Sequence, residues 1–248
     1  MTRAPLLTLA AAAILACAGP SAKQRRGAEI HHDLGVEALR GGHAQEALRE
    51  FDEALKLDPA FPEAHRGRGL VLDLAFGKQE EAEKEYRRAL ALRPDYSEAH
   101  NDLGQLLAKT GRREQALAEF DAALANLMYR EPWVARCNRG LAVWGMGRKD
   151  EGIAELRSCV SQSPRYCEGR RDLGQVLLAD GRTREAIDQF SAYVDACPHR
   201  PDAHLQLALA RIKAGDVAGA RVELERCREL GLGLPEGEEC ARTLSTLK

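Results

Sequence analysis

The chain has 248 residues, of which 30 % are charged and 5 % are aromatic, and its formal net charge is −2. A composition rich in Ala and Leu with few aromatic residues is typical of an all-helical protein that packs through small side chains. The charges are balanced, and basic pairs alternate with Asp and Glu. The sequence therefore has no clustered basic face and argues against nucleic acid as a partner.

The first residues of the chain, 1–16, have the features of a secretory signal peptide. Arg3 is followed by an uncharged apolar stretch from Ala4 to Ala16. This stretch is too short to be a stable transmembrane helix, so we exclude it from the predicted fold.

Cys17 stands at the predicted cleavage site, and residues 14–17 (Ile-Leu-Ala-Cys) resemble the lipobox of bacterial lipoproteins. That resemblance implies cleavage before Cys17 and acylation, palmitate included, of its sulfur and new amine, which anchors the chain in a membrane. Ala18, where an Asp would favour the inner membrane, implies the outer membrane of a Gram-negative bacterium, facing the periplasm. The alternative is ordinary cleavage after Ala18, which would give a soluble secreted chain. Residues 17–27 are expected to be a flexible tether.

From residue 28 onward, one pattern recurs six times. A Gly, once an Ala, is followed about twelve residues later by a small residue and then, one helical turn on, by an aromatic residue or Leu. The anchors are Gly35, Gly69, Gly104, Gly140, Gly174 and Ala208, and the aromatic or Leu positions are Phe51, Tyr86, Phe120, Leu156, Phe190 and Leu224. This period of 34 to 36 residues resembles the tetratricopeptide repeat (TPR), a two-helix hairpin that stacks into a solenoid.

The resemblance implies an all-α fold, a right-handed superhelical TPR solenoid of six helix-turn-helix repeats with a C-terminal capping helix. A Gly costs about 1 kcal/mol inside a helix relative to Ala, so we expect the two helices of each hairpin to cross closely at the anchor, opposite the small residue. Glycines in the hairpin turns are expected to end the first helices with a positive φ. The predicted repeats are 28–61, 62–96, 97–132 with an irregular junction, 133–166, 167–200 and 201–234, and the capping helix is 235–248.

Six cysteines follow Cys17, all in the second half of the chain: Cys137, Cys159, Cys167, Cys197, Cys227 and Cys240. An even number in an exported protein suggests disulfides. Cys159 and Cys227 occupy the same small-residue position in two second helices, and Cys167 and Cys240 lie on the first helices that follow. We therefore expect Cys159–Cys167 and Cys227–Cys240, the alternative being free cysteines that replace Ala in the core. No Cys/His spacing indicates a metal site.

No catalytic motif is present: the sequence lacks HExxH, GxSxG and Walker A patterns. His65 and His100 stand at equivalent positions of two repeats, which makes them repeat features rather than a catalytic pair. We expect a protein that is not an enzyme and that uses no cofactor and no small-molecule substrate.

A partner is expected on the concave face of the array, at positions two, five, nine, twelve and thirteen of each first helix. The candidate contact residues there are Val36, Leu39, Arg66, Leu70 and Leu74. An apolar groove flanked by charge suits an apolar strand or an amphipathic helix, the alternative being that some of these residues pack inward. The Lys and Asn that clamp a C-terminal carboxylate in chaperone-binding TPRs are absent, since His32 and Val36 stand in their places in the first repeat.

The repeats are interrupted after the third copy, where Met128 replaces the closing Pro. The Tyr, Glu, Ala, Asn, Gly spacing at this junction and the six repeats behind a lipobox resemble the type IV pilus biogenesis lipoproteins, the pilotin family of PilF, PilW and Tgl. The six additional cysteines depart from that family. The junction residues are Tyr129, Glu131, Ala135, Asn138 and Gly140.

The pilotin resemblance implies an outer-membrane lipoprotein that binds subunits of the pilus secretin and promotes their membrane insertion and multimerisation, and hence pilus-dependent motility. The alternatives are a general periplasmic TPR adaptor and an accessory subunit in envelope or polysaccharide assembly. Within the array, we interpret the part before Tyr129, where apolar concave positions gather, as the recognition half and the cysteine-bearing part as a braced half.

Overall fold

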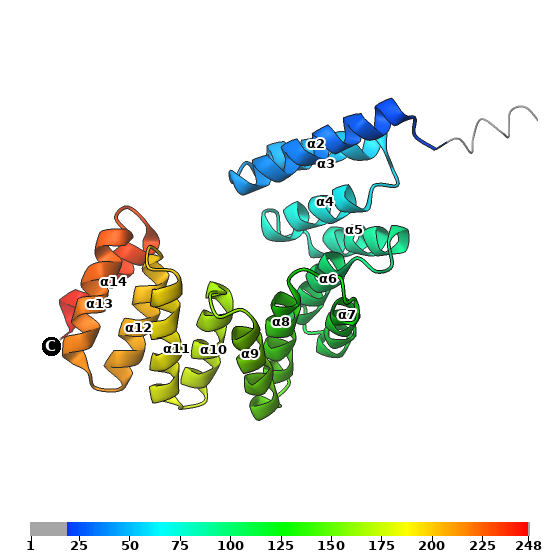
Figure 1. Cartoon of the computed structure of the whole chain (residues 1–248). Helices are drawn as coiled ribbons and strands as arrows, with labels where there is room; N and C mark the ends of the chain where they lie inside the picture. The colour runs from blue at the N-terminus through cyan, green and yellow to red at the C-terminus, as the bar shows by residue number, and fades with distance from the viewer. Residues whose placement is uncertain (1–18, 248) are drawn as a thin grey trace, which may run out of the picture. The chain divides into compact units, whose positions relative to one another are not determined.

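The computed structural model describes residues 19–247, so the predicted signal peptide and Cys17 lie outside the described residues. In this range the chain forms thirteen α-helices and no strand, which confirms the all-α prediction (Figure 1). The helices are α2 (Ala22–Arg40), α3 (Ala44–Leu57), α4 (Pro62–Leu74), α5 (Gln79–Leu92), α6 (Ser97–Lys109), α7 (Arg113–Ala125), α8 (Pro132–Gly145), α9 (Lys149–Gln162), α10 (Cys167–Ala179), α11 (Thr183–Ala196), α12 (Pro201–Lys213), α13 (Val217–Leu230) and α14 (Pro235–Thr246).

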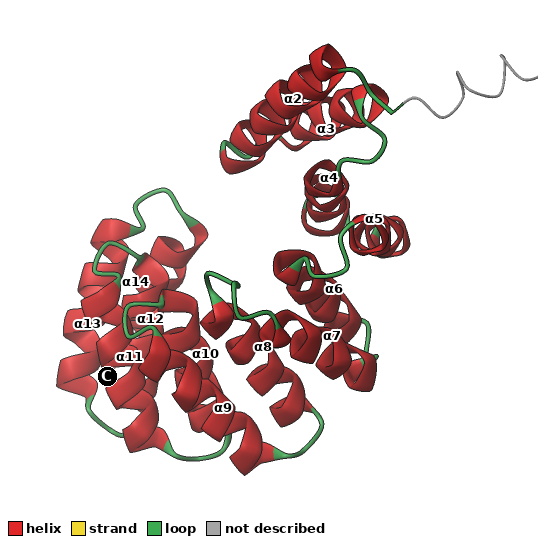
Figure 2. Ribbon diagram, turned by 45° about the vertical axis from the view of Figure 1, so that its right-hand side comes forward, coloured by secondary structure: helices red, strands yellow, loops and turns green. Residues whose placement is uncertain are grey.

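The helices divide into two compact units, residues 1–102 and 103–248, and each is described by itself. In both units, even-numbered first helices pair with the odd-numbered second helices that follow them (Figure 2). Neighbouring first helices also contact each other, as α2 does α4 and α10 does α12, whereas no two second helices of one unit are in contact along the described chain. The first helices therefore line the inner side of each unit.

Glycines end the first helices as the sequence predicts. Each hairpin turn contains a Gly with a φ between 65° and 85°, a conformation that L side chains rarely adopt. These residues are Gly42, Gly77, Gly111, Gly147, Gly181 and Gly215.

The expected tether is shorter than predicted. Residues 22–27, placed in the tether from sequence, form the first turns of α2, which is 19 residues long where the other helices have 12 to 14. Ser21 and Gln24 explain this start, because they form a capping box in which each side chain bonds the other's backbone N–H. The sequence reading missed this signal because the composition of the segment resembles a linker.

The anchor glycines make room for an aromatic ring rather than for a second backbone. A Cβ on Gly35 would lie 2.8 Å from the ring of Phe51, and one on Gly67, in the next first helix, would lie 2.5 Å from the same ring. Phe51 is fully buried between these two helices. The expected crossing against the small residue of the second helix is therefore wrong for this repeat, where the space belongs to the ring. Gly69, Gly104 and Gly174 likewise face the rings of Tyr86, Phe120 and Phe190.

The fourth repeat brings the two backbones together at the anchor. There Leu156 replaces the aromatic residue, and a Cβ on Gly140 would lie 3.1 Å from the carbonyl oxygen of Gly152. A smaller side chain at the crossing thus lets the helices approach until their main chains touch.

All six cysteines beyond Cys17 are paired in three disulfides. Cys227 on α13 is bonded to Cys240 on α14, the pairing expected from sequence. The expected Cys159–Cys167 pair is wrong, because Cys159 is bonded to Cys137, which stands across from it on the first helix of its own hairpin at a Cα–Cα distance of 5.4 Å. Cys167, at the start of α10, is bonded to Cys197, which follows α11.

Gly169 is the residue whose identity points to the Cys137–Cys159 disulfide. The equivalent position is Ala in the second, third, fourth and sixth repeats. A Cβ on Gly169 would lie 2.9 Å from the sulfur of Cys137 and 3.2 Å from that of Cys159. The disulfide therefore occupies the space that the Ala methyl group fills in the other repeats.

The shared contact of Gly35 and Gly67 with Phe51 predicts that substitutions there are not additive. Gly67→Ala crowds the ring and Phe51→Leu empties the same space, so the double variant should be more stable than the sum of the single effects by about 0.5–3 kcal/mol. Urea unfolding of the four proteins measures this coupling. Gly41→Ala is the matched control, since its Cβ would meet its nearest atom at an ordinary 3.4 Å. Additive effects of Gly67→Ala and Phe51→Leu would contradict the contact.

The disulfide pattern predicts that Gly169→Ala is more harmful while Cys137 and Cys159 are bonded than when they are absent. In the oxidised protein the added methyl should lower the free energy of unfolding by about 1–3 kcal/mol, because it meets both sulfurs and the ring of Tyr166. In a Cys137→Ala/Cys159→Ala background the same change should cost less, since only the contact with the Tyr166 ring remains. Peptide mapping without reduction provides the direct check, and a cross-linked peptide joining Cys159 to Cys167 would overturn the assignment.

Candidate partner-binding surface

The histidines expected to be repeat features lie where the repeats join. His65 Nδ1 lies 2.7 Å from Glu85 Oε2, and its Nε2 lies 3.2 Å from the carbonyl oxygen of Pro59, which ends the previous repeat. His204 makes the equivalent pair of contacts with Glu223 and Pro198. These side chains bind one repeat to the next. In the part of the chain that the structure describes, no group of three or more His, Cys, Asp or Glu side chains could hold a metal ion.

Arg66, a candidate contact residue, forms its polar contacts within its own chain. Its Nε donates to Asp102 Oδ2 at 2.5 Å, and its guanidinium lies 5.9 Å from the ring centre of Tyr96. Although burial disfavours its charge, the Asp102 carboxylate raises the pKa of Arg66 above its ordinary value. Burial raises the pKa of Asp102, whose side chain is only 7 % exposed, and Arg66 acts against that shift. Arg66 therefore connects α4 to the start of α6.

The apolar candidates differ in what they offer to a partner. Val36 and Leu39 are half-buried and pack on the cluster around Phe51, so the structure places them mainly in the core of the first repeat. Leu70 on α4 is half-buried. Leu74, at the end of α4, is 69 % exposed. Of the five candidates, Leu74 is the one with a free apolar surface.

Phe76 extends the exposed apolar surface at the end of α4 and was missed from sequence. It lies in the turn that follows Leu74 and is 37 % exposed. The other hairpin turns carry mostly polar residues around the positive-φ Gly, whereas this turn reads Ala-Phe-Gly beside Gly77. We name Leu70, Leu74 and Phe76 the α4 apolar surface. Exposed apolar surface of this kind marks a candidate site of protein interaction.

The apolar concave positions do not stop at the junction, which corrects the division into two halves. In the second unit, Leu141 and Trp144 on α8 and Leu178 on α10 are half-buried against the core. Leu209 and Ile212 occupy the same positions on α12. The inner side of the second unit is therefore also apolar, though its side chains pack inward.

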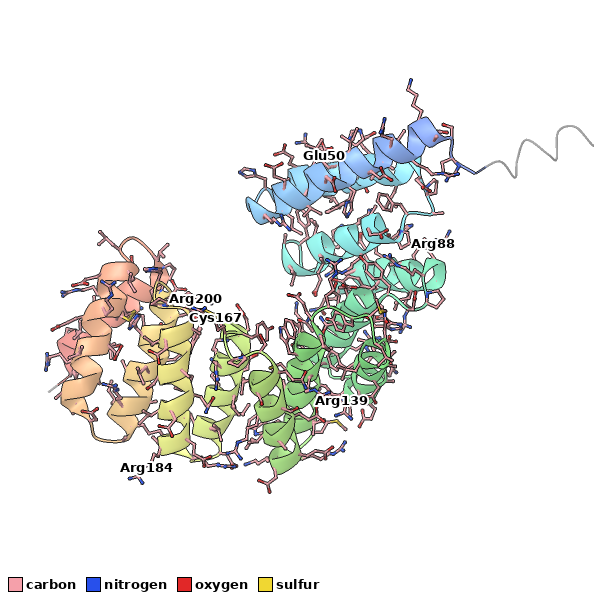
Figure 3. The ribbon with its side chains drawn as sticks, in the orientation of Figure 1. Glu50, Arg88, Arg139, Cys167, Arg184 and Arg200 are labelled. Carbon is pink, nitrogen blue, oxygen red and sulfur yellow. A yellow bond between two sulfur atoms is a disulfide. The ribbon has the colours of Figure 1, made fainter. Side chains whose placement is uncertain are left out.

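Charged groups hold the beginnings of α10 and α12. Arg200 donates to Glu168 at 2.9 Å and to Asp202 at 3.0 Å, and the hydroxyl of Tyr193 donates to Asp202 at 2.6 Å. Figure 3 shows Arg200 and Cys167 at the same end of these helices. Although burial opposes it, the hydrogen bonds from Arg200 and Tyr193 lower the pKa of Asp202. These groups bind one another and so stabilise the packing of the fifth repeat against the sixth.

The junction loop between α7 and α8 carries a second exposed apolar pair. Leu127 is 97 % exposed and Met128 84 % exposed. Asn126 shapes the loop, because its side-chain oxygen accepts the backbone N–H of Met128 at 2.9 Å. The residue found in place of the closing Pro is thus presented to solvent.

Family profiles described as "TPR repeat" and "Tetratricopeptide repeat" match this chain at residues 28–61, 74–111, 137–201 and 171–226, which together exceed half its length. Comparison with curated protein sequences gave no match. No helix among the described residues is both long and apolar enough to cross a membrane.

Solved structures with this fold include two from type IV pilus biology. The fold matches PilW, described as a widely conserved type IV pilus biogenesis factor, with a TM-score of 0.74 and 23 % identity over 86 % of this chain and 98 % of PilW. It matches PilF of Pseudomonas aeruginosa with a TM-score of 0.69 and 18 % identity over 89 % of this chain and 99 % of PilF. It also matches a chain of the APC/C hetero-tetramer Cut9–Hcn1, with a TM-score of 0.72 and 15 % identity over 90 % of this chain and 43 % of that one. At these identities the likeness shows the fold.

The buried pair of Arg66 and Asp102 predicts a pH-dependent loss of stability in Arg66→Met. At pH 7 the variant leaves a buried carboxylate without its partner, which should cost about 3 kcal/mol of unfolding free energy. An acid whose folded pKa is raised loses stability as the pH rises through that pKa, so the deficit should shrink as the pH falls toward about 4 and Asp102 takes up a proton.

Urea unfolding at the two pH values measures this deficit. Lys56→Met removes one partner of the exposed Lys56–Glu53 pair and should leave the stability unchanged at both pH values. A deficit in Arg66→Met that does not vary with pH would show that Asp102 is not the group left unpaired.

Proposed function

The chain belongs to the tetratricopeptide repeat family, and on that premise we propose that it is a binding scaffold in type IV pilus biogenesis. The observation that carries this proposal is the extent of the structural match. The match is extensive in both directions, over 86 % of this chain and 98 % of PilW and over 89 % of this chain and 99 % of PilF, whereas the chain accounts for only 43 % of the Cut9–Hcn1 chain of comparable TM-score. A repeat array of the same extent as the two pilus proteins supports the same kind of task.

We place this scaffold at the outer membrane, as a lipoprotein anchored through Cys17 and facing the periplasm. The support is the sequence at residues 14–18, where an apolar segment ends in a lipobox-like Cys followed by Ala. Two or more acyl chains on one residue anchor a protein stably, at roughly 0.8 kcal/mol per buried CH₂.

The partner we propose is a subunit of the pilus secretin. The scaffold would hold an apolar segment of that subunit during its insertion and multimerisation, which requires binding and release but no covalent step. The α4 apolar surface is the site we assign to this contact, because Leu74 and Phe76 are exposed apolar side chains at the end of one rigid helix. Full burial of a Leu or Phe side chain contributes about 1.5–3 kcal/mol.

A general periplasmic adaptor, or an accessory subunit in envelope or polysaccharide assembly, is the second candidate. The match to Cut9–Hcn1 supports keeping it, since that structure shows that the fold is not confined to pilus proteins. The two candidates differ in which assembly fails when the protein is removed.

Deletion of the gene should abolish the heat-resistant secretin multimers that a gel of unboiled membranes displays. Complementation with Leu74→Glu should restore fewer multimers than the unchanged protein, because a carboxylate in an apolar contact stays unpaired. Val222→Glu is the matched control, since Val222 is a 63 % exposed apolar residue on the second helix α13. Its complementation should be complete.

The same strains separate the parts of the proposal. Cys17→Ala should leave the membrane fraction, and a variant that remains there would overturn the lipid anchor. Unchanged secretin multimers in the deletion strain would overturn the pilus function, and a defect in envelope polysaccharide would then favour the adaptor. Equal multimer levels with Leu74→Glu and Val222→Glu would overturn the α4 apolar surface alone.

A further inference from the structure

Helix α2 begins the array and has an apolar face without a neighbour in its unit. Ile30 is 54 % exposed and Leu34 46 % exposed. The two residues are one helical turn apart, so they lie on one face. An exposed apolar face on a regular helix indicates a surface that is covered in the functional state.

The later repeats show what covers these positions elsewhere. The residue five before the anchor, Ile30 in the first repeat, is Ala64 in the second, which packs with Ala54 of the preceding second helix. In the third it is Ala99, which packs with Ala89 in the same way. Ile30 and Leu34 thus lie on the stacking side of α2, where no preceding repeat lies among the described residues.

The residues at the start of α2 carry positive charge, which is unfavourable at the N-terminus of a helix. Lys23, Arg25 and Arg26 are exposed, and no acidic residue lies in the first turn. A cation near a helix N-terminus is opposed by the helix dipole. Arg25 donates to the carbonyl oxygen of Pro20 at 3.1 Å, whereas Lys23 and Arg26 have no ion pair within the described chain. The free positive charges therefore complement an anionic surface outside the protein.

The position of the proposed anchor identifies that surface. Ala22 is five positions after Cys17, with four residues between them, so the start of α2 lies within about 17 Å of the acylated residue even if the connection is fully extended. Arg26, Ile30 and Leu34 follow one another at intervals of four residues along the helix, with Lys23 one turn before them. A basic end followed by apolar residues is a feature of helices that lie in a membrane interface, and the exposed Glu37, three residues beyond Leu34, ends the apolar row.

We propose that α2 lies on the bilayer to which Cys17 is anchored, with Lys23 and Arg26 at the lipid phosphates and Ile30 and Leu34 at the boundary of the acyl chains. This inference rests on the lipid anchor of the proposed function. It adds that the first repeat is held against the membrane by its own side chain contacts rather than suspended from a tether.

The test uses the lipidated full-length protein, reconstituted into vesicles of phosphatidylcholine and phosphatidylglycerol whose acyl chains are brominated. Ile30→Trp should show fluorescence that is shifted to the blue and quenched relative to unbrominated vesicles. The native Trp133 and Trp144 give the background, measured with the unchanged protein. Leu74→Trp is the matched control, an exposed apolar residue of the same unit that should not be quenched.

A second variant tests the charges. Adding Lys23→Gln and Arg26→Gln to Ile30→Trp should reduce the quenching, as should vesicles of phosphatidylcholine alone or raised salt, because the attraction to phosphatidylglycerol is screened. Quenching that is the same in all these conditions would overturn the role of the two basic residues.

The outcomes separate this inference from the function on which it rests. If the unchanged protein floats with the vesicles but Ile30→Trp is not quenched, the docking of α2 is wrong and the anchor stands. If the unchanged protein does not float, the anchor fails and the docking with it. A blue shift without quenching, together with a cross-linked dimer, would assign the face to a second copy of the chain and overturn the proposal.

Discussion

The fold depends on one contact, the insertion of a second-helix side chain into the gap left by a first-helix glycine. Phe51 is enclosed by Gly35 of its own hairpin and Gly67 of the next, so one ring fixes both the hairpin and the stacking of two repeats. Each helical Gly costs about 1 kcal/mol, and the burial of a Phe side chain offsets this with about 1.5–3 kcal/mol.

Two of the three disulfides occur where this contact is weakest, whereas Cys167–Cys197 lies in the fifth repeat, which keeps its buried ring at Phe190. The fourth and sixth repeats have Leu156 and Leu224 in place of the ring. In each, a Cys three residues later, Cys159 or Cys227, forms a disulfide from the second helix to a first helix or to the cap. A covalent bond there compensates for the smaller side chain, because it limits the conformations of the unfolded chain. The bracing of the C-terminal part is thus related to its packing.

Features that depend on contacts within one repeat could be predicted from the sequence. Features that depend on contacts with the adjacent repeat could not. Period, turns and the positive-φ glycines follow from local pattern. Cys159 lies between the first helix of its own repeat and the first helix of the next repeat. Its position alone therefore does not decide whether its disulfide partner is Cys137 or Cys167. The absence of the consensus Ala at Gly169 indicates a bulky group beside Cys159, but only the structure identifies Cys137 as its partner. The ion pair of Arg66 was not predictable for the same reason, because its partner Asp102 is 36 residues away in another repeat.

The same reasoning explains why the two ends of the array differ. Whether a given position of the repeat is buried or exposed depends on whether another repeat or a capping helix packs against it. At the C-terminal end, Cys240 is bonded to Cys227 and Leu244 and Leu247 pack on the last core cluster, so the final stacking side is covered by the chain itself. At the N-terminal end, Ile30 and Leu34 have no such cover. A protein that needed only solubility could have placed polar residues there, as the exposed side of α14 does with Glu238 and Glu239. That apolar residues stand there instead, directly after the segment that leads to Cys17, argues that the covering surface comes from outside the chain.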